Sequence, residues 1–189
     1  ACLGSTITYS TLAGMSNYTW VVPAEGTVVS GGSTGDNQVK VNWNTTGIHT
    51  ISLNYTNPSM CSAVTPTNYA VTVFELPTPT ISGPADACKG GAVTVYTTEP
   101  GMTGYIWSIS GGTITAGGSA NSNTATVVWN TVGTQTIRVN YYNANNCAAA
   151  SPFVYPVNVI APPPPTCPAN RVVCSDDIPF NLIGGTPAG

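Results

Sequence analysis

Alternation of apolar and polar residues is the dominant pattern along this chain, and it predicts β-strands throughout. The clearest example is VKVNW followed by ISLNY, at residues 39–43 and 51–55, where every second residue is apolar. A period of two places one set of side chains on a buried face. Because a tight turn at Gly47 separates the two runs, we predict that they form a β-hairpin.

The same stretch occurs twice, which indicates tandem modules. Residues 39–61 and 125–147 align without a gap and are identical at 11 of 23 positions. Other equivalent pairs, at a spacing of about 86 residues, are Cys2 and Cys88, Trp20 and Trp107, and Val71 and Val157. A fixed period of this length is typical of repeated domains. We therefore predict a first module at residues 1–76, truncated at its N-terminal edge, and a second at 77–161. Residues 162–189 are predicted to be a proline linker and the incomplete start of a third β module.

Each predicted module has about seven short strands and no helical period. Further strands are expected at residues 7–9, 17–22, 27–30 and 69–73, with counterparts at 93–96, 104–110, 113–115 and 155–159. Glycine-rich turns separate them. The predicted fold class is all-β, with tandem immunoglobulin-like antiparallel β-sandwiches of about seven strands each.

Aromatic residues fall at two kinds of position in these strands. Those at inward positions are expected in the core, and they are Tyr18, Trp20, Tyr55, Tyr69, Tyr105, Trp107, Tyr141 and Tyr155. Tyr142 and Phe74 fall at outward positions instead. An exposed aromatic surface often marks a binding site, so these two residues are candidates for binding a sugar or a protein.

The cysteines predict disulfides and export. Cys2 and Cys61 are separated by 59 positions, and so are Cys88 and Cys147. This equal spacing favours one disulfide within each module, joining its start to the loop before its last strand. Disulfides persist outside a reducing cytoplasm.

Two further cysteines lie in the C-terminal segment. Cys174 pairs either locally with Cys167 or with a residue beyond Gly189, and the local pair is favoured because it requires nothing outside this sequence.

Proline-rich stretches join the predicted modules. LPTPT at residues 76–80 and APPPPT at residues 161–166 each follow a predicted final strand. Proline fixes φ and favours extended geometry. We therefore expect the modules to stack end to end as a semi-rigid rod.

Composition excludes several functions. Charged residues make up 6% of the chain, the net charge is −3, and there are only four Lys and Arg residues. Nucleic-acid binding needs more positive charge than this to neutralise phosphates. No apolar run approaches the roughly 20 residues of a membrane helix, so neither nucleic acid nor membrane insertion is expected.

Candidate catalytic and metal-binding residues are few. The single histidine, His49, is replaced by Gln135 in the second copy, and catalysis needs several converging groups. We therefore predict no enzyme activity and no cofactor. Asp176, Asp177 and Asp86 are weak candidates for a calcium site near module junctions, but solvated loop acids are the default interpretation.

The order of motifs also resembles a known family. A Trp-bearing strand, then V-x-V-x-W-N-T-x-G, then G-x-x-T-I-x-x-N-Y leading to a Cys is similar to the PKD-like, immunoglobulin-type repeats of large Bacteroidota cell-surface adhesins. The resemblance covers residues 1 to about 160, and the tail CSDDIPFNLIGGTPAG looks like the opening of another repeat. It implies an exported, non-catalytic surface protein of the gliding-motility adhesin type, delivered by type IX secretion.

The sequence thus favours a structural and adhesive function. We expect spacer modules of a long extracellular or cell-surface adhesin or filament. Their expected partners are neighbouring modules of the same chain and, outside it, an extracellular polysaccharide or a surface protein. The alternatives are a carbohydrate-binding or accessory module of a secreted hydrolase, and a fibre that assembles through the open tail.

Overall fold

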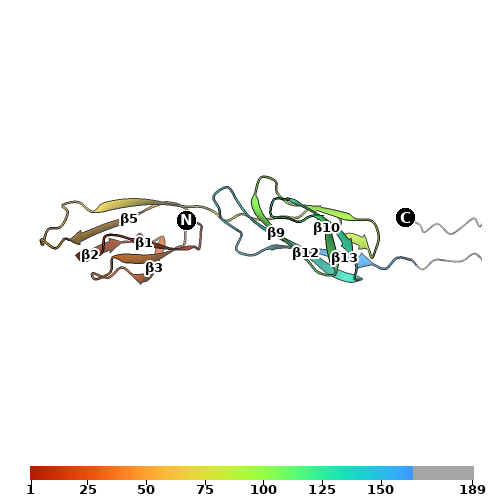
Figure 1. The fold of residues 1–189 in the computed structure, drawn as a ribbon, viewed down its shortest axis with the longest axis horizontal. Helices are drawn as coiled ribbons and strands as arrows, with labels where there is room; N and C mark the ends of the chain where they lie inside the picture. The colour runs from red at the N-terminus through yellow and green to blue at the C-terminus, as the bar shows by residue number, and fades with distance from the viewer. Residues whose placement is uncertain (164–189) are drawn as a thin grey trace, which may run out of the picture.

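The computed structural model describes residues 1–163, in which thirteen β-strands build two β-sandwiches joined end to end (Figure 1). Each sandwich has its own cluster of buried apolar residues. Nowhere in residues 1–163 is there a helix of the length and apolar character needed to cross a membrane. The predicted all-β class with immunoglobulin-like sandwiches is confirmed.

The first sandwich contains six strands in two antiparallel sheets. Its strands are β1 (Thr6–Ser10), β2 (Ser16–Val21), β3 (Gly26–Gly31), β4 (Gln38–Trp43), β5 (Gly47–Thr56) and β6 (Thr67–Val73). One sheet has the order β1-β4-β3 and the other the order β2-β5-β6. Strands β6 and β1 therefore both lie at sheet edges.

The second sandwich has the same plan with one additional strand. Its strands are β7 (Asp86–Cys88), β8 (Thr94–Thr97), β9 (Thr103–Ile109), β10 (Gly112–Gly117), β11 (Thr124–Trp129), β12 (Gly133–Tyr142) and β13 (Phe153–Ile160). The sheets have the orders β10-β11-β8 and β7-β13-β12-β9. The additional strand, β7, runs parallel to β13, whereas all other pairs are antiparallel.

The predicted hairpin is wrong, although its two strands are present. Strand β4 pairs with β1 and β3, and β5 pairs with β2 and β6, so the two strands belong to opposite sheets. The second copy does the same with β11 and β12. Gly47 and Gly133, with φ of 122° and 104°, allow the chain to arch from one sheet to the other. Alternation identifies which residues are buried, and it does not distinguish a hairpin from such an arch.

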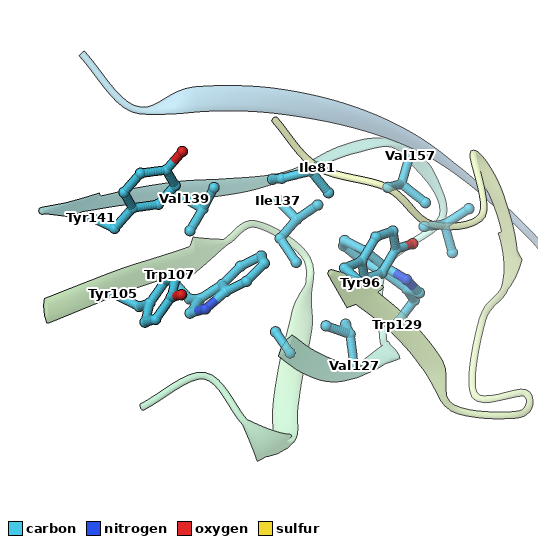
Figure 2. Packing of buried hydrophobic residues seen from close by; sticks show 12 residues of the cluster. Ile81, Tyr96, Tyr105, Trp107, Val127, Trp129, Ile137, Val139, Tyr141 and Val157 are labelled. Atoms are coloured by element: carbon cyan, nitrogen blue, oxygen red, sulfur yellow. The ribbon is translucent and has the colours of Figure 1, made fainter. Parts of the chain in front are cut away.

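The arch brings the apolar faces of both strands into one core. In the first sandwich the buried cluster is Val39, Val41, Trp43, Ile51, Val71 and Val73. Figure 2 shows the larger cluster of the second sandwich, in which Trp129 and Tyr96 from one sheet lie close to Val157 from the other, with Ile137 nearby. Burial of these side chains contributes roughly 25 cal/mol per Å² of apolar surface removed from water.

Most of the inward aromatic residues are buried or half-buried, as predicted. Tyr69 is the exception, because 61% of its surface is exposed. It lies on the edge strand β6, and the ring of Tyr9 packs against it with centroids 6.0 Å apart.

Candidate functional site

The junction between the two sandwiches is the most elaborate site in residues 1–163. The start of the first sandwich lies at the end that faces the second, as the position of the N-terminus in Figure 1 shows. Cys2 forms a parallel bridge with Phe74 just after β6, and the Leu3 N–H donates to the Phe74 carbonyl at 2.9 Å. The first residues and the last strand of the sandwich therefore meet beside the linker.

A disulfide crosses this junction. Cys2 of the first sandwich is bonded to Cys147 of the second, with 5.7 Å between their Cα atoms and 145 positions between them in sequence. We call it the junction disulfide. The predicted pairs Cys2–Cys61 and Cys88–Cys147 are therefore wrong. Within residues 1–163, Cys61 and Cys88 have no disulfide partner, and both are exposed.

The length of the sandwich explains why the predicted pairs do not form. Strand β5 has ten residues; its first residue pairs with Val73, close to Cys2, while its last forms a bridge with Ser62, next to Cys61. At about 3.3 Å per residue this strand spans about 30 Å, whereas a disulfide requires Cα atoms within about 7 Å. The second sandwich separates Cys88 from Cys147 in the same way. Equal spacing reflects the repeat and does not identify the bonding partner.

The loop between β12 and β13 holds Cys147 in place. The Asn143 side-chain oxygen accepts hydrogen bonds from the backbone N–H groups of Asn145 and Cys147, each at 3.0 Å. The Asn143 amide donates to the Glu75 carbonyl of the first sandwich at 3.3 Å. We call residues 143–147 and their counterpart 57–61 the asparagine loops. Only 1% of the Cys147 surface is exposed.

The linker is packed against the second sandwich. Residues 76–79 and 149–154 together line a shallow, mainly apolar groove. Ile81 then enters the core of the second sandwich, and Ser82 exchanges two backbone hydrogen bonds of 2.9 Å with Thr97. The segment between the modules is therefore part of the second one.

The carboxylate of Glu99 also binds the linker, at Thr80. Glu99 accepts hydrogen bonds from the Thr80 hydroxyl and from the Thr80 N–H, the latter at 3.2 Å. The hydroxyls of Thr98 and Tyr141 donate to it at 2.6 and 2.9 Å. Burial raises the pKa of the Glu99 carboxyl, but the hydrogen bonds from Thr80 and Thr98 outweigh it and lower the pKa from 4.5 to about 2. Burial and the bond to Glu99 raise the pKa of Tyr141.

The predicted surface aromatics lie at this junction as well. Phe74 is half-buried at the end of the first sandwich, and Tyr142, 38% exposed, is in the last position of β12 next to the asparagine loop. Their role in binding a sugar or protein stays a prediction.

Other predicted site residues are distributed elsewhere. Asp86 is exposed on β7 and accepts a hydrogen bond from the Asn158 amide at 3.0 Å. His49 stacks on Trp43, with ring centroids 5.3 Å apart, and its Nε2 lies 3.0 Å from the Thr45 carbonyl oxygen. Within residues 1–163 no three His, Cys, Asp or Glu side chains gather as a metal site would require. Cys167, Cys174, Asp176 and Asp177 lie outside the described residues.

The sequence contained a signal for the junction. Both copies have the motif Asn-x-x-x-Cys, at residues 57–61 and 143–147, and this motif marks the loop that presents each second cysteine. The Glu99 cluster had no such signal, because its members come together only in the folded chain.

The fold and the junction together define a tandem immunoglobulin-like β-sandwich protein. The sequence model of the PKD-like domain family matches residues 1–71 and 75–158. The chain therefore belongs to the PKD-like domain family. No curated protein sequence matches it.

Several solved structures are similar to this chain at low sequence identity. The fibronectin(III)-like modules of Clostridium thermocellum CbhA are 14% identical, with 85% of this chain and 88% of that chain covered and a TM-score of 0.43. The Escherichia coli adhesin FdeC is 16% identical, with 85% and 60% covered and a TM-score of 0.33. Invasin, a bacterial integrin-binding protein, is 13% identical, with 86% and 37% covered and a TM-score of 0.35.

Proposed function

We propose that this chain is a non-catalytic, stiff spacer within a long exported cell-surface adhesin or filament. The observation that carries the proposal is the junction disulfide between Cys2 and Cys147. Domains joined by one linker move relative to each other by default. The disulfide is a second covalent connection, between residues 145 positions apart in sequence, and it opposes bending at the junction.

The chemistry of the chain supports a location outside the cell. A structural disulfide persists in an oxidising environment and is rare in the cytoplasm. We further propose that the parent protein acts in gliding motility and is exported by type IX secretion. We also propose that it contacts an extracellular polysaccharide or a surface protein. We also propose that the modules occupy residues 1–76 and 77–161 and that residues 162–189 belong to a linker and the start of a third.

Small-angle X-ray scattering tests the stiffness. We expect the oxidised chain to give a single extended conformation with a narrow range of maximum dimensions. The Cys2→Ser/Cys147→Ser variant should bend at the junction and broaden that range. The matched control, Cys61→Ser/Cys88→Ser, keeps the junction disulfide and should match the monomer fraction of the unmodified chain. Equal flexibility of the first variant and the control would contradict the proposal.

A cellular experiment tests the surface role. In the source organism, the Cys2→Ser/Cys147→Ser protein should reach the surface in normal amounts but support less adhesion. Unchanged adhesion would contradict the spacer function. If the purified chain instead binds a polysaccharide and Tyr142→Ala abolishes that binding, the accessory-module alternative is favoured.

A further inference from the structure

We propose that Cys61 and Cys88 form further junction disulfides, each with an adjoining PKD-like module, so that these bonds recur from module to module. Cys88 is the repeat equivalent of Cys2, and Cys61 is the repeat equivalent of Cys147. The bond seen between Cys2 and Cys147 joins the first cysteine of one module to the second cysteine of the next. By the same rule, Cys88 should bond to the second cysteine of the following module, and Cys61 to the first cysteine of the preceding module.

The backbone around Cys88 makes the same contacts as the backbone around Cys2. Cys2 forms a parallel bridge with Phe74, and Cys88 pairs in parallel with Ile160. In both modules the N–H of the residue after the cysteine donates to the carbonyl of that partner at 2.9 Å. The backbone that presents Cys2 to the second sandwich is thus repeated around Cys88, at the far end of that sandwich.

The loop around Cys61 likewise has the same hydrogen bonds and backbone conformation as the loop around Cys147. In each asparagine loop the side-chain oxygen of the first residue, Asn57 or Asn143, accepts a hydrogen bond from the N–H of the cysteine at 3.0 Å. The residue before each cysteine has a positive φ, 64° at Met60 and 58° at Asn146. The two loops differ in surroundings, because Cys147 is buried at the junction while Cys61 is exposed.

The two unpaired thiols lie at opposite ends of the pair of sandwiches. Cys61 is at the end of the first sandwich remote from the junction, beside the last residue of β5. Cys88 is beside the last residue of β13, remote from the asparagine loop of its own module. A module stacked beyond the second sandwich, in the geometry of the existing junction, therefore presents an asparagine-loop cysteine to Cys88. A second copy of this chain placed head to tail presents its own Cys61.

The bond forms by thiol–disulfide exchange with a small-molecule or protein disulfide as the oxidant. The Cys88 thiolate attacks one sulfur of the oxidant and expels the other as a thiol. The Cys61-type thiolate of the adjoining module then attacks the Cys88 sulfur and expels the second thiol. The two cysteines lose two protons and two electrons, and the oxidant disulfide is reduced to two thiols.

Complementary variants test the inference, using the 189-residue chain with Cys167→Ser and Cys174→Ser to remove unrelated thiols. In this background, Cys61→Ser retains Cys88 and Cys88→Ser retains Cys61. Each is incubated alone, and the two are mixed, in oxidised and reduced glutathione. A protein concentration of about 1 mM matches the effective concentration that a short linker provides. Products are followed on non-reducing gels and by mass spectrometry of peptides.

We expect the mixture to give a covalent dimer joined between Cys88 and Cys61, at least tenfold more abundant than the dimer from either variant alone. The chain that retains both thiols should give a ladder of longer head-to-tail products. Homodimers as abundant as the mixed dimer, or no dimer in the mixture, would overturn the inference. So would a Cys88–Cys167 or Cys88–Cys174 peptide from the unmodified chain.

The inference rests on the proposed function in one respect, since it requires neighbouring modules of the same kind. The two can fail separately. Failure of the mixed dimer leaves the scattering result for the Cys2–Cys147 junction unchanged, whereas a flexible oxidised chain removes the stiff spacer even if the mixed dimer forms.

Discussion

The two sandwiches share a fold but differ in how their cores are closed. In the first, a groove between the two sheets is lined by Tyr9, Trp20, Ile51 and Tyr69, among others. In the second, the linker covers the equivalent place. The Tyr155 hydroxyl donates to the Gly83 carbonyl at 2.8 Å, and the Tyr96 hydroxyl donates to the Pro84 carbonyl at 3.1 Å.

The exposure of two equivalent tyrosines reflects whether the linker covers the core. Tyr96 is completely buried, whereas its counterpart Tyr9 is half-buried. A Cβ added to Gly83 would lie 2.4 Å from the Tyr96 ring, so the linker passes as close to the aromatic residue as glycine allows. In the second sandwich the segment before β7 is therefore part of the core as well as a connection.

Opening the junction disulfide should have the largest effect on the two sandwiches. Cross-linking residues 145 positions apart reduces the loop-closure entropy of the unfolded chain, which is worth about 5 kcal/mol. We expect Cys2→Ser to lower the summed free energy of unfolding by up to this amount. Two separate urea transitions should appear, the first from the less closed first sandwich. Cys61→Ser is the control, and a similar loss there would contradict the explanation.

Removing the linker's apolar contact should weaken the second sandwich selectively. Ile81 is 7% exposed in its core, and Ile→Ala changes at such sites cost about 2–5 kcal/mol. Hydrogen exchange measured by mass spectrometry should show faster exchange in β8–β13 and unchanged exchange in β1–β6. Ile48→Ala, at a residue 74% exposed, should change stability by less than about 0.5 kcal/mol. Equal effects in both sandwiches would show that the linker does not belong to the second core.

Acid should lower the free energy of unfolding of the second sandwich more than that of the first, by a smaller amount than the changes above. The Glu99 carboxyl has its pKa lowered from 4.5 to about 2, so it stabilises the folded state above its unfolded pKa. That stability is lost as the pH falls from about 4.5 to about 2. Because Glu99 is only half-buried and solvent screens part of the interaction, we expect a loss of about 1 kcal/mol, confined to the second sandwich.

The control for acid comes from the first sandwich. Leu12 occupies the position of Glu99 there, since the Tyr18 and Tyr105 hydroxyls donate to the Leu12 and Glu99 carbonyls, each at 2.7 Å. Glu99→Leu should therefore remove the pH dependence of the second sandwich between pH 4.5 and 2. Persistence of that dependence in Glu99→Leu would assign it to other groups.

The asparagine loop should give the smallest effect. Asn143→Ala removes the hydrogen bond to Glu75 across the junction and two within the loop. Only the bond to Glu75 crosses the junction, and a typical hydrogen bond contributes about 1 kcal/mol. The junction disulfide should therefore become roughly fivefold easier to reduce in a dithiothreitol titration. Asn57→Ala removes the two corresponding hydrogen bonds within the other asparagine loop and should leave reduction unchanged. Equal shifts in both variants would mean that the loop does not position Cys147.

The sequence allowed the strands, the repeat and the fold class to be predicted, because alternation directly reports which side chains face a core. It did not allow strand partners to be predicted, since β4 and β5 alternate in the same way in an arch as in a hairpin. The cysteine pairing failed for a related reason. Spacing identified Cys2 and Cys61 as equivalents of Cys88 and Cys147, but the length of β5 decided which of them can meet. The Glu99 cluster depends on Thr80, Thr98 and Tyr141 converging in space, and no local pattern predicts that.

The bond between Cys2 and Cys147 also determines which residues carry tension when the chain is pulled from both ends. The pull passes from Cys2 directly through the sulfur atoms to Cys147, so residues 3–146 are bypassed. The whole first sandwich and most of the second are shielded from force, which acts on β13 and the segment after it. Reduction would add the bypassed segment to the extensible length, about 500 Å at roughly 3.5 Å per residue. A chain held in this way lengthens under drag only after the bond between Cys2 and Cys147 is cut.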